Sequence, residues 1–108
     1  MIALRTVHVT PPAAERIDRL GLQAEMRRMI EYAQHSLPEI TRIQVVLYDR
    51  DELDEEPGLA IEVFTPFQSF DAAGSTREKI SEWLVSQFSP QVLEHLTIDY
   101  LPEAPDAG

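Results

Sequence analysis

The stretch from Thr41 to Thr65, TRIQVVLYDRDELDEEPGLAIEVFT, decides the predicted fold. Aliphatic side chains occupy alternate positions in both of its halves: Ile43, Val45 and Leu47, then Leu59, Ile61 and Val63. A period of two with many β-branched residues is typical of strands. The polar segment between the halves ends in Pro57-Gly58, a turn dipeptide. The stretch therefore predicts an antiparallel hairpin with a long acidic loop.

Four further elements follow from the same kind of pattern on either side of the hairpin. A strand is predicted over 2–9 and a helix from Pro12 to about Ser36, continuous or broken at Gly21. A second helix, capped by Asp71 or Ser75, ends before Pro90, and a last strand covers 96–101. The eight prolines all fall at the ends of these elements, between them or in the tail, which supports the boundaries because proline is excluded from helix interiors and central strands. Residues 1–101 are thus expected to form one domain, and 102–108 a flexible C-terminal tail.

The predicted order is β-α-β-β-α-β, and it indicates an α+β fold. Two right-handed crossovers joined by a hairpin give the split βαβ arrangement, a four-stranded antiparallel sheet with two helices on one face. This topology resembles that of ferredoxin-like domains. It implies no particular activity, because one fold serves many functions.

Composition excludes several classes of function. The chain has no cysteine, so disulfides and thiolate chemistry are excluded. Its formal net charge is −10, with nine basic residues against nineteen acidic ones, which argues against nucleic acid as a partner. No apolar stretch is long enough for a membrane span, and none has the pattern of a signal peptide. A cytoplasmic location is the default expectation.

Much of the negative charge lies in the hairpin loop. Its acidic side chains are Asp49, Asp51, Glu52, Asp54, Glu55 and Glu56. A solvated loop tip explains them simply, and a surface for a basic partner is the alternative. Leu53 stands where an EF-hand would need another ligand, and the required glycine is missing, so no metal site and no cofactor are predicted.

The sheet face opposite the helices is expected to carry Val46, Tyr48 and Phe64 among polar neighbours. Apolar patches of this kind often mark interfaces, although a half-apolar outer face is also ordinary. The pattern favours a non-catalytic protein-interaction or regulatory domain that self-associates as a homodimer or binds a protein partner.

A second hypothesis places chemistry on the same face. His8 on the first strand, beside Tyr48 or Asp99, could act as an acid or base or contact a ligand. That set would suit a small-ligand-binding protein or a cofactor-free enzyme. No serine or threonine has the sequence setting of a nucleophile, and the four scattered glycines form no phosphate-binding loop. An enzyme is therefore the less favoured hypothesis.

Overall fold

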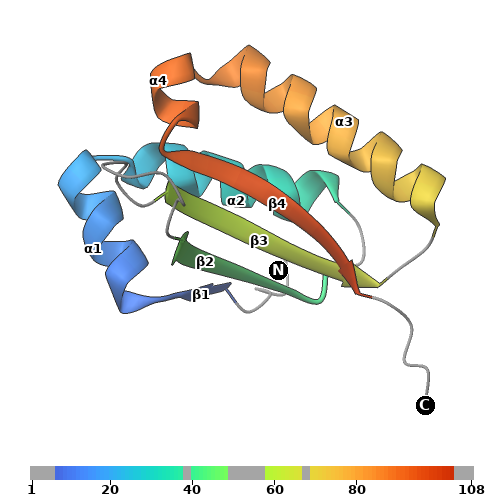
Figure 1. The fold of residues 1–108 in the computed structure, drawn as a ribbon, viewed down its shortest axis with the longest axis horizontal. Coiled ribbons are helices and arrows are strands. Elements are labelled where there is room, and N and C mark those ends of the chain that lie inside the picture. The colour runs from blue at the N-terminus through green and yellow to red at the C-terminus, as the bar shows by residue number, and fades with distance from the viewer. Residues whose placement is uncertain (1–6, 38–39, 49–57, 67–68, 104–108) are drawn as a thin grey trace.

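The computed structural model describes residues 7–37, 40–48, 58–66 and 69–103. The elements follow one another as β1 (Val7–Val9), α1 (Pro11–Leu20), α2 (Gln23–Ser36), β2 (Arg42–Tyr48), β3 (Gly58–Pro66), α3 (Phe70–Gln87), α4 (Pro90–Leu93) and β4 (Leu96–Glu103) (Figure 1). None of these helices is long and apolar enough to cross a membrane.

The four strands form one mixed sheet in the order β1-β2-β3-β4. The predicted hairpin is present, with β2 and β3 antiparallel and Val45 opposite Ile61. The two outer pairs, β1 with β2 and β3 with β4, are parallel. The prediction of a four-stranded antiparallel, ferredoxin-like sheet was therefore wrong, because that fold places the first strand inside the sheet whereas β1 lies at its outer edge.

Burial explains why β2 and β3, and not β1, are the central strands. Four successive residues of β3, from Gly58 to Ile61, are buried, so this strand is covered on both faces at that end. By contrast, the described part of the strand predicted over 2–9 is β1, which pairs over three residues, none of them buried; residues 2–6 lie outside the described ranges. A short strand with the polar side chain of His8 in its middle suits an edge, where one side needs no ladder partner.

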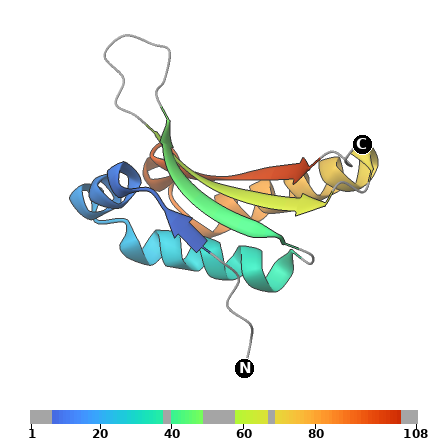
Figure 2. The ribbon, with the colours of Figure 1, turned by 90° about the horizontal axis from the view of Figure 1, so that it is seen from below.

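Both long helices lie on the same face of the sheet (Figure 2). The Tyr32 ring of α2 stacks on Trp83 of α3 at 3.9 Å between centroids, and Trp83 meets Phe88 edge-on at 5.4 Å. The Arg28 guanidinium lies 4.7 Å over the Phe88 ring and donates a hydrogen bond from Nη2 to Gln87 Oε1. These contacts hold α2 against α3 above a shared core.

The two strand–helix–strand crossovers have opposite hands. Both crossovers lead to the next strand in the same direction across the sheet, and their helices lie on the same face. The strands of the pair β1–β2, however, run opposite to those of the pair β3–β4. The crossover from β1 to β2 is the left-handed one (Figures 1 and 2). Since right-handed crossovers predominate strongly, the β1–β2 unit is the unusual half of the fold.

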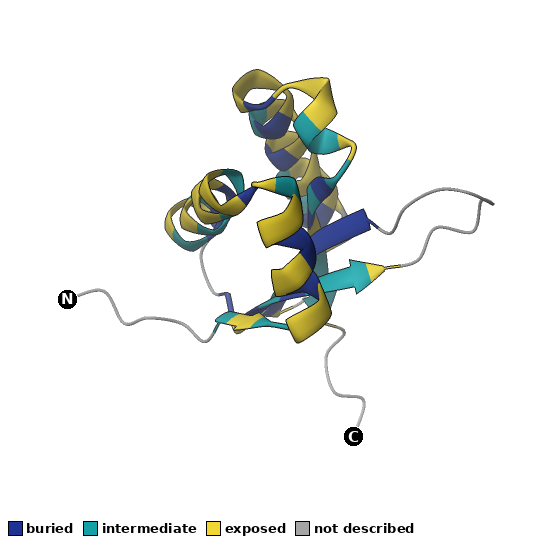
Figure 3. Ribbon diagram, turned by 90° about the vertical axis from the view of Figure 1, so that its left-hand side faces the viewer, coloured by how far each residue is buried: buried dark blue, intermediate teal, exposed yellow. Residues whose placement is uncertain are grey.

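The core lies between the helices and one face of the sheet, where buried residues gather (Figure 3). Its largest fully buried side chains are Ile17, Met29, Ile40, Ile43, Leu59, Ile61, Leu96, Val45 and Val63. Burial of each contributes about 1.5–3 kcal/mol before the cost of ordering. All of the strand residues in this set belong to the alternating positions predicted to face the helices.

The first helical stretch is broken at Gly21, one of the two predicted alternatives: Gly21 has a left-handed backbone (φ 68°) and separates α1 from α2. Other boundaries differ from the predicted ones. Helix α3 begins after Ser69, whose side chain accepts from Ala72 N–H, and not at Asp71 or Ser75. The last strand runs to Glu103, into the segment expected to be a tail, and the rest of that segment lies outside the described residues.

Candidate functional site

The sheet face turned away from the helices is not covered by any described helix (Figure 2). Strand register aligns its side chains in rows across the sheet, and the central row consists of His8, Gln44, Glu62 and Asp99. His8 and Asp99 are exposed at its two ends, and Gln44 and Glu62 are half-buried between them. Neighbouring strands lie about 4.8 Å apart, so this row spans about 14 Å. It is polar throughout, with a histidine at one end and a carboxylate at the other.

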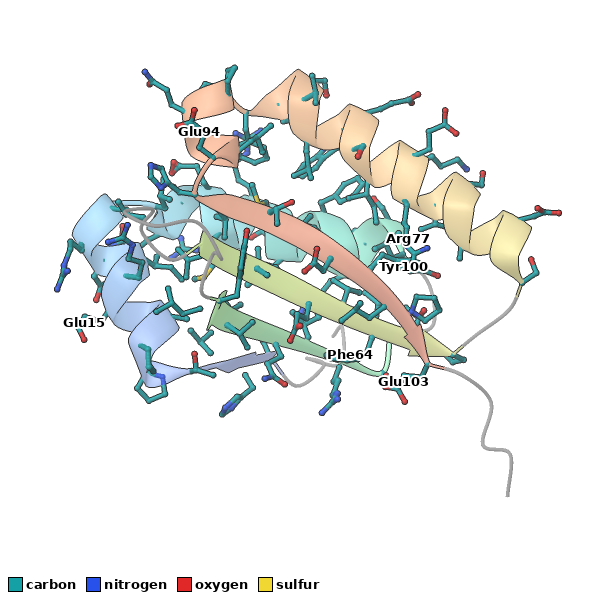
Figure 4. The ribbon with its side chains drawn as sticks, in the orientation of Figure 1. Glu15, Phe64, Arg77, Glu94, Tyr100 and Glu103 are labelled. Atoms are coloured by element: carbon teal, nitrogen blue, oxygen red, sulfur yellow. The ribbon has the colours of Figure 1, made fainter. Side chains whose placement is uncertain are left out.

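Less polar rows flank the central one. Val46, Ala60 and Thr97 form the row on one side. Arg42, Phe64 and Leu101 form the row on the other. The Arg42 guanidinium lies 4.0 Å from the centroid of the Phe64 ring, so a cation covers part of this aromatic surface. Figure 4 labels Phe64 on β3. The face is therefore less openly apolar than the sequence pattern suggests.

Tyr48 and Gly58 are directly opposite each other at the loop end of the hairpin. A Cβ atom at Gly58 would lie 2.6 Å from both Cζ and Oη of Tyr48, so the ring occupies the space above the glycine. The side chain of Tyr48 nevertheless stays 40% exposed. This contact gives Gly58 a structural reason to lack a side chain.

The structure does not bring His8, Tyr48 and Asp99 together. His8 and Asp99 share a row but are three strand spacings apart, about 14 Å. Tyr48 lies four residues along β2 from Gln44, the partner of His8, which is about 13 Å. Proton transfer between these groups within one chain needs hydrogen-bond distances. The geometry thus gives no support to a shared acid–base site.

The predicted interface residues Val46, Tyr48 and Phe64 do share the open face. They lie in three different rows along adjacent strands. The acidic residues Asp49, Asp51, Glu52, Asp54, Glu55 and Glu56 lie outside the described residues. The open face is thus the part of the predicted interface for which the structure gives geometry.

A groove between α3 and β4 was not predicted from the sequence. Its volume is about 310 Å³, and it is lined by Arg77, Ile80, Ser81, Leu84 and residues 97–101. Arg77 Nη2 donates to the Tyr100 carbonyl at 3.2 Å, and its guanidinium lies 5.9 Å from the Tyr100 ring (Figure 4). The four α3 residues of the groove have the i, i+3, i+4, i+7 spacing of one helix face, which the sequence shows. That this face lies beside the edge strand β4 follows only from the strand order.

The remaining chemistry of the described residues is limited. Burial raises the pKa of the Tyr32 hydroxyl above its ordinary value. Within the described ranges, no group of three or more His, Asp or Glu side chains could hold a metal ion. No protein-family model, curated protein or solved structure matches the chain. Inference about function therefore starts from the open face and the groove.

Proposed function

We propose that this chain is a non-catalytic protein-interaction domain that self-associates through its open sheet face. The observation that carries the proposal is the central row of His8, Gln44, Glu62 and Asp99. If a second copy of the row is placed opposite the first in reversed order, a basic or amide side chain faces a carboxylate at every position. A second copy is therefore a chemically suitable partner for the face.

The complementarity depends on one choice of two-fold axis. An axis in the interface and parallel to the strands reverses the order of the row. It places His8 opposite the partner's Asp99, and Gln44 opposite the partner's Glu62. The same operation brings the Val46 row onto its own copy, apolar against apolar. A C2 interface is self-complementary in this sense, and sheets pack face to face within about 30° of alignment.

The size of the face limits the expected affinity. Four strands at about 4.8 Å spacing and about seven residues at 3.3 Å give a projected area of roughly 400 Å² per copy. Stable interfaces bury about 800 Å² per partner. We therefore expect a reversible dimer with a dissociation constant of about 10–100 µM, the weak end of specific association.

Sedimentation equilibrium across about 5–500 µM tests the proposal over the range expected for a weak complex. Val46→Glu places an unpaired carboxylate in the interface and should weaken the dimer at least about tenfold, since burying an unpaired charge costs several kcal/mol. Val85→Glu is the matched control, because Val85 is 72% exposed on α3 and lies away from the sheet face. This control should dimerise like the unaltered chain.

A charge exchange tests the proposed axis. His8→Asp sets an aspartate opposite the partner's Asp99 and should weaken the dimer. Adding Asp99→His to the same chain again places a histidine opposite an aspartate at both ends of the row. The double variant should recover most of the lost association. A chain that stays monomeric throughout the concentration range, or a Val46→Glu variant that associates as strongly as Val85→Glu, would refute self-association through this face.

A further inference from the structure

The outer edge of β4 has backbone groups directed away from the sheet. Leu59 N–H donates to the His95 carbonyl at 2.9 Å, which fixes the phase of the parallel ladder. In a parallel ladder, alternate residues direct both backbone groups to the same neighbour. Thr97 and Asp99 therefore bond to β3, and Ile98 and Tyr100 point outward. Apart from the Tyr100 carbonyl, which accepts from Arg77, these groups have no partner among the described residues.

The groove beside this edge suits a single extended chain. Helix α3 runs along β4 on the helix-covered side of the sheet, and in Figure 1 it lies on the side of β4 that is away from β3. A second folded copy paired edge to edge would bring its own α3 against this helix. Arg77 closes one end by binding the Tyr100 carbonyl, and Pro102 beyond it has no N–H to offer. About five residues of an added strand fit between these limits and Leu96.

The two sides of the groove differ in chemistry. Ile80 and Leu84 on α3, with Ile98 on β4, make the side under the helix apolar. On the open face, Asp99 is exposed and Glu62 is its neighbour in the same row. An added strand would direct alternate side chains to these two sides. Apolar residues alternating with basic ones match both, and the net charge of −10 attracts such a peptide from solution.

We propose that the groove between α3 and β4 binds an extended peptide of another protein as a fifth, antiparallel strand. Its apolar side chains enter the groove below α3, and its basic side chains lie beside Asp99. Backbone bonds to Ile98 and Tyr100 give affinity, and the alternating side chains give specificity. This site uses the edge of the sheet and does not depend on self-association of the open face.

The probe is the pentapeptide acetyl-Lys-Val-Lys-Val-Lys-amide, titrated into ¹⁵N-labelled protein. We expect the amide resonances of Ile98 and Tyr100 to shift most, while that of Asp99, whose N–H is bonded to β3, shifts less. In the antiparallel register, the valine N–H groups face β4 and the lysine N–H groups face solvent. N-methylation of both valines should weaken binding at least about tenfold, and N-methylation of the lysines should change it less than about threefold.

Two charge-reversal variants distinguish binding of the peptide beside Asp99 from its general attraction to the negatively charged protein. Asp99→Lys should weaken binding of the peptide at least about tenfold. Glu82→Lys, an equal change in net charge on the exposed side of α3, should weaken it less than about threefold. Repeating the titration on Val46→Glu removes competition from the dimer and should leave binding in place. Shifts confined to the open face, equal effects of the two methylation patterns, or equal effects of the two reversals would overturn the proposal.

Discussion

Two glycines of this chain differ in what a methyl group would meet. A Cβ at Gly58 would overlap the end of the Tyr48 ring, whereas a Cβ at Gly74, inside α3, would meet nothing within 4 Å. We expect Gly58→Ala to displace the Tyr48 ring into solvent and to cost about 0.5–1 kcal/mol of stability, the size of a cross-strand contact. Gly74→Ala should instead stabilise the chain by about 0.5–1 kcal/mol, because alanine is the better helix former.

Urea unfolding of both variants measures these free energies, and the ring resonances of Tyr48 report its displacement. The pair forms its own control, since the same substitution is made twice. Equal signs for the two changes in stability would contradict this account of Gly58.

Residue-level predictions succeeded where one sequence period decided the outcome. Alternation placed Ile43, Val45, Ile61 and Val63 in the core because each strand has only two faces. The contact between Tyr48 and Gly58 could not be predicted in the same way. It depends on hairpin register across a long loop, and the turn pattern Pro57-Gly58 does not indicate that Gly58 opens β3.

At the scale of elements, Gly21 separates two helices. Leu22 N–H donates to the Ile17 carbonyl and Gly21 N–H to the Asp18 carbonyl, the bonding of a Schellman motif. The left-handed backbone of Gly21 disfavours a Cβ, so Gly21→Ala should destabilise the chain by about 1–2 kcal/mol. Gly21→Asn should cost less, because asparagine adopts this conformation more readily. Chemical denaturation of both variants checks the prediction, and an alanine variant as stable as the asparagine variant would contradict it.

The ends of helices were predictable where a proline or glycine decides them. They were less predictable where a serine or threonine could either cap a helix or lie inside it. Ser75 and Glu78 have the spacing of a capping box, yet they lie inside α3, which begins after Ser69. The nearby Thr76 hydroxyl donates to the Ala72 carbonyl one turn back, as hydroxyl side chains do within helices. Local sequence alone does not distinguish these two roles.

At the scale of the whole molecule, the order of strands was the part that sequence could not supply. Periodicity identified each strand but not its neighbour, and the preference for right-handed crossovers favoured the wrong sheet. The two sheets differ in whether β1 or β2 lies inside, and burial favours β2: Ile43 and Val45 are buried there, whereas no residue of β1 is, a difference that emerges only after the helices have packed. The groove beside β4 was missed for the same reason, since an edge is defined by strand order.

Strand order also implies that stability is uneven across the sheet. β1 pairs with β2 over three residues through a left-handed crossover, whereas β3 pairs with β2 over seven and with β4 over eight. The amide of Thr10, which is half-buried beyond the end of β1, donates to the Val45 carbonyl, and Ile61 is a fully buried residue of the central strand β3. We expect β1 to detach without unfolding the rest, since weakly packed units open below the global free energy.

Native-state hydrogen exchange in low denaturant measures this difference. The amide of Thr10 should exchange with an opening free energy at least about 2 kcal/mol below that of Ile61, and with little dependence on denaturant because little surface is exposed. Val9→Ala should lower protection in β1 alone, whereas Ile61→Ala should lower it throughout the sheet by about 2–4 kcal/mol. Equal opening free energies at Thr10 and Ile61 would mean that the left-handed unit is as firmly joined to the sheet as its right-handed counterpart.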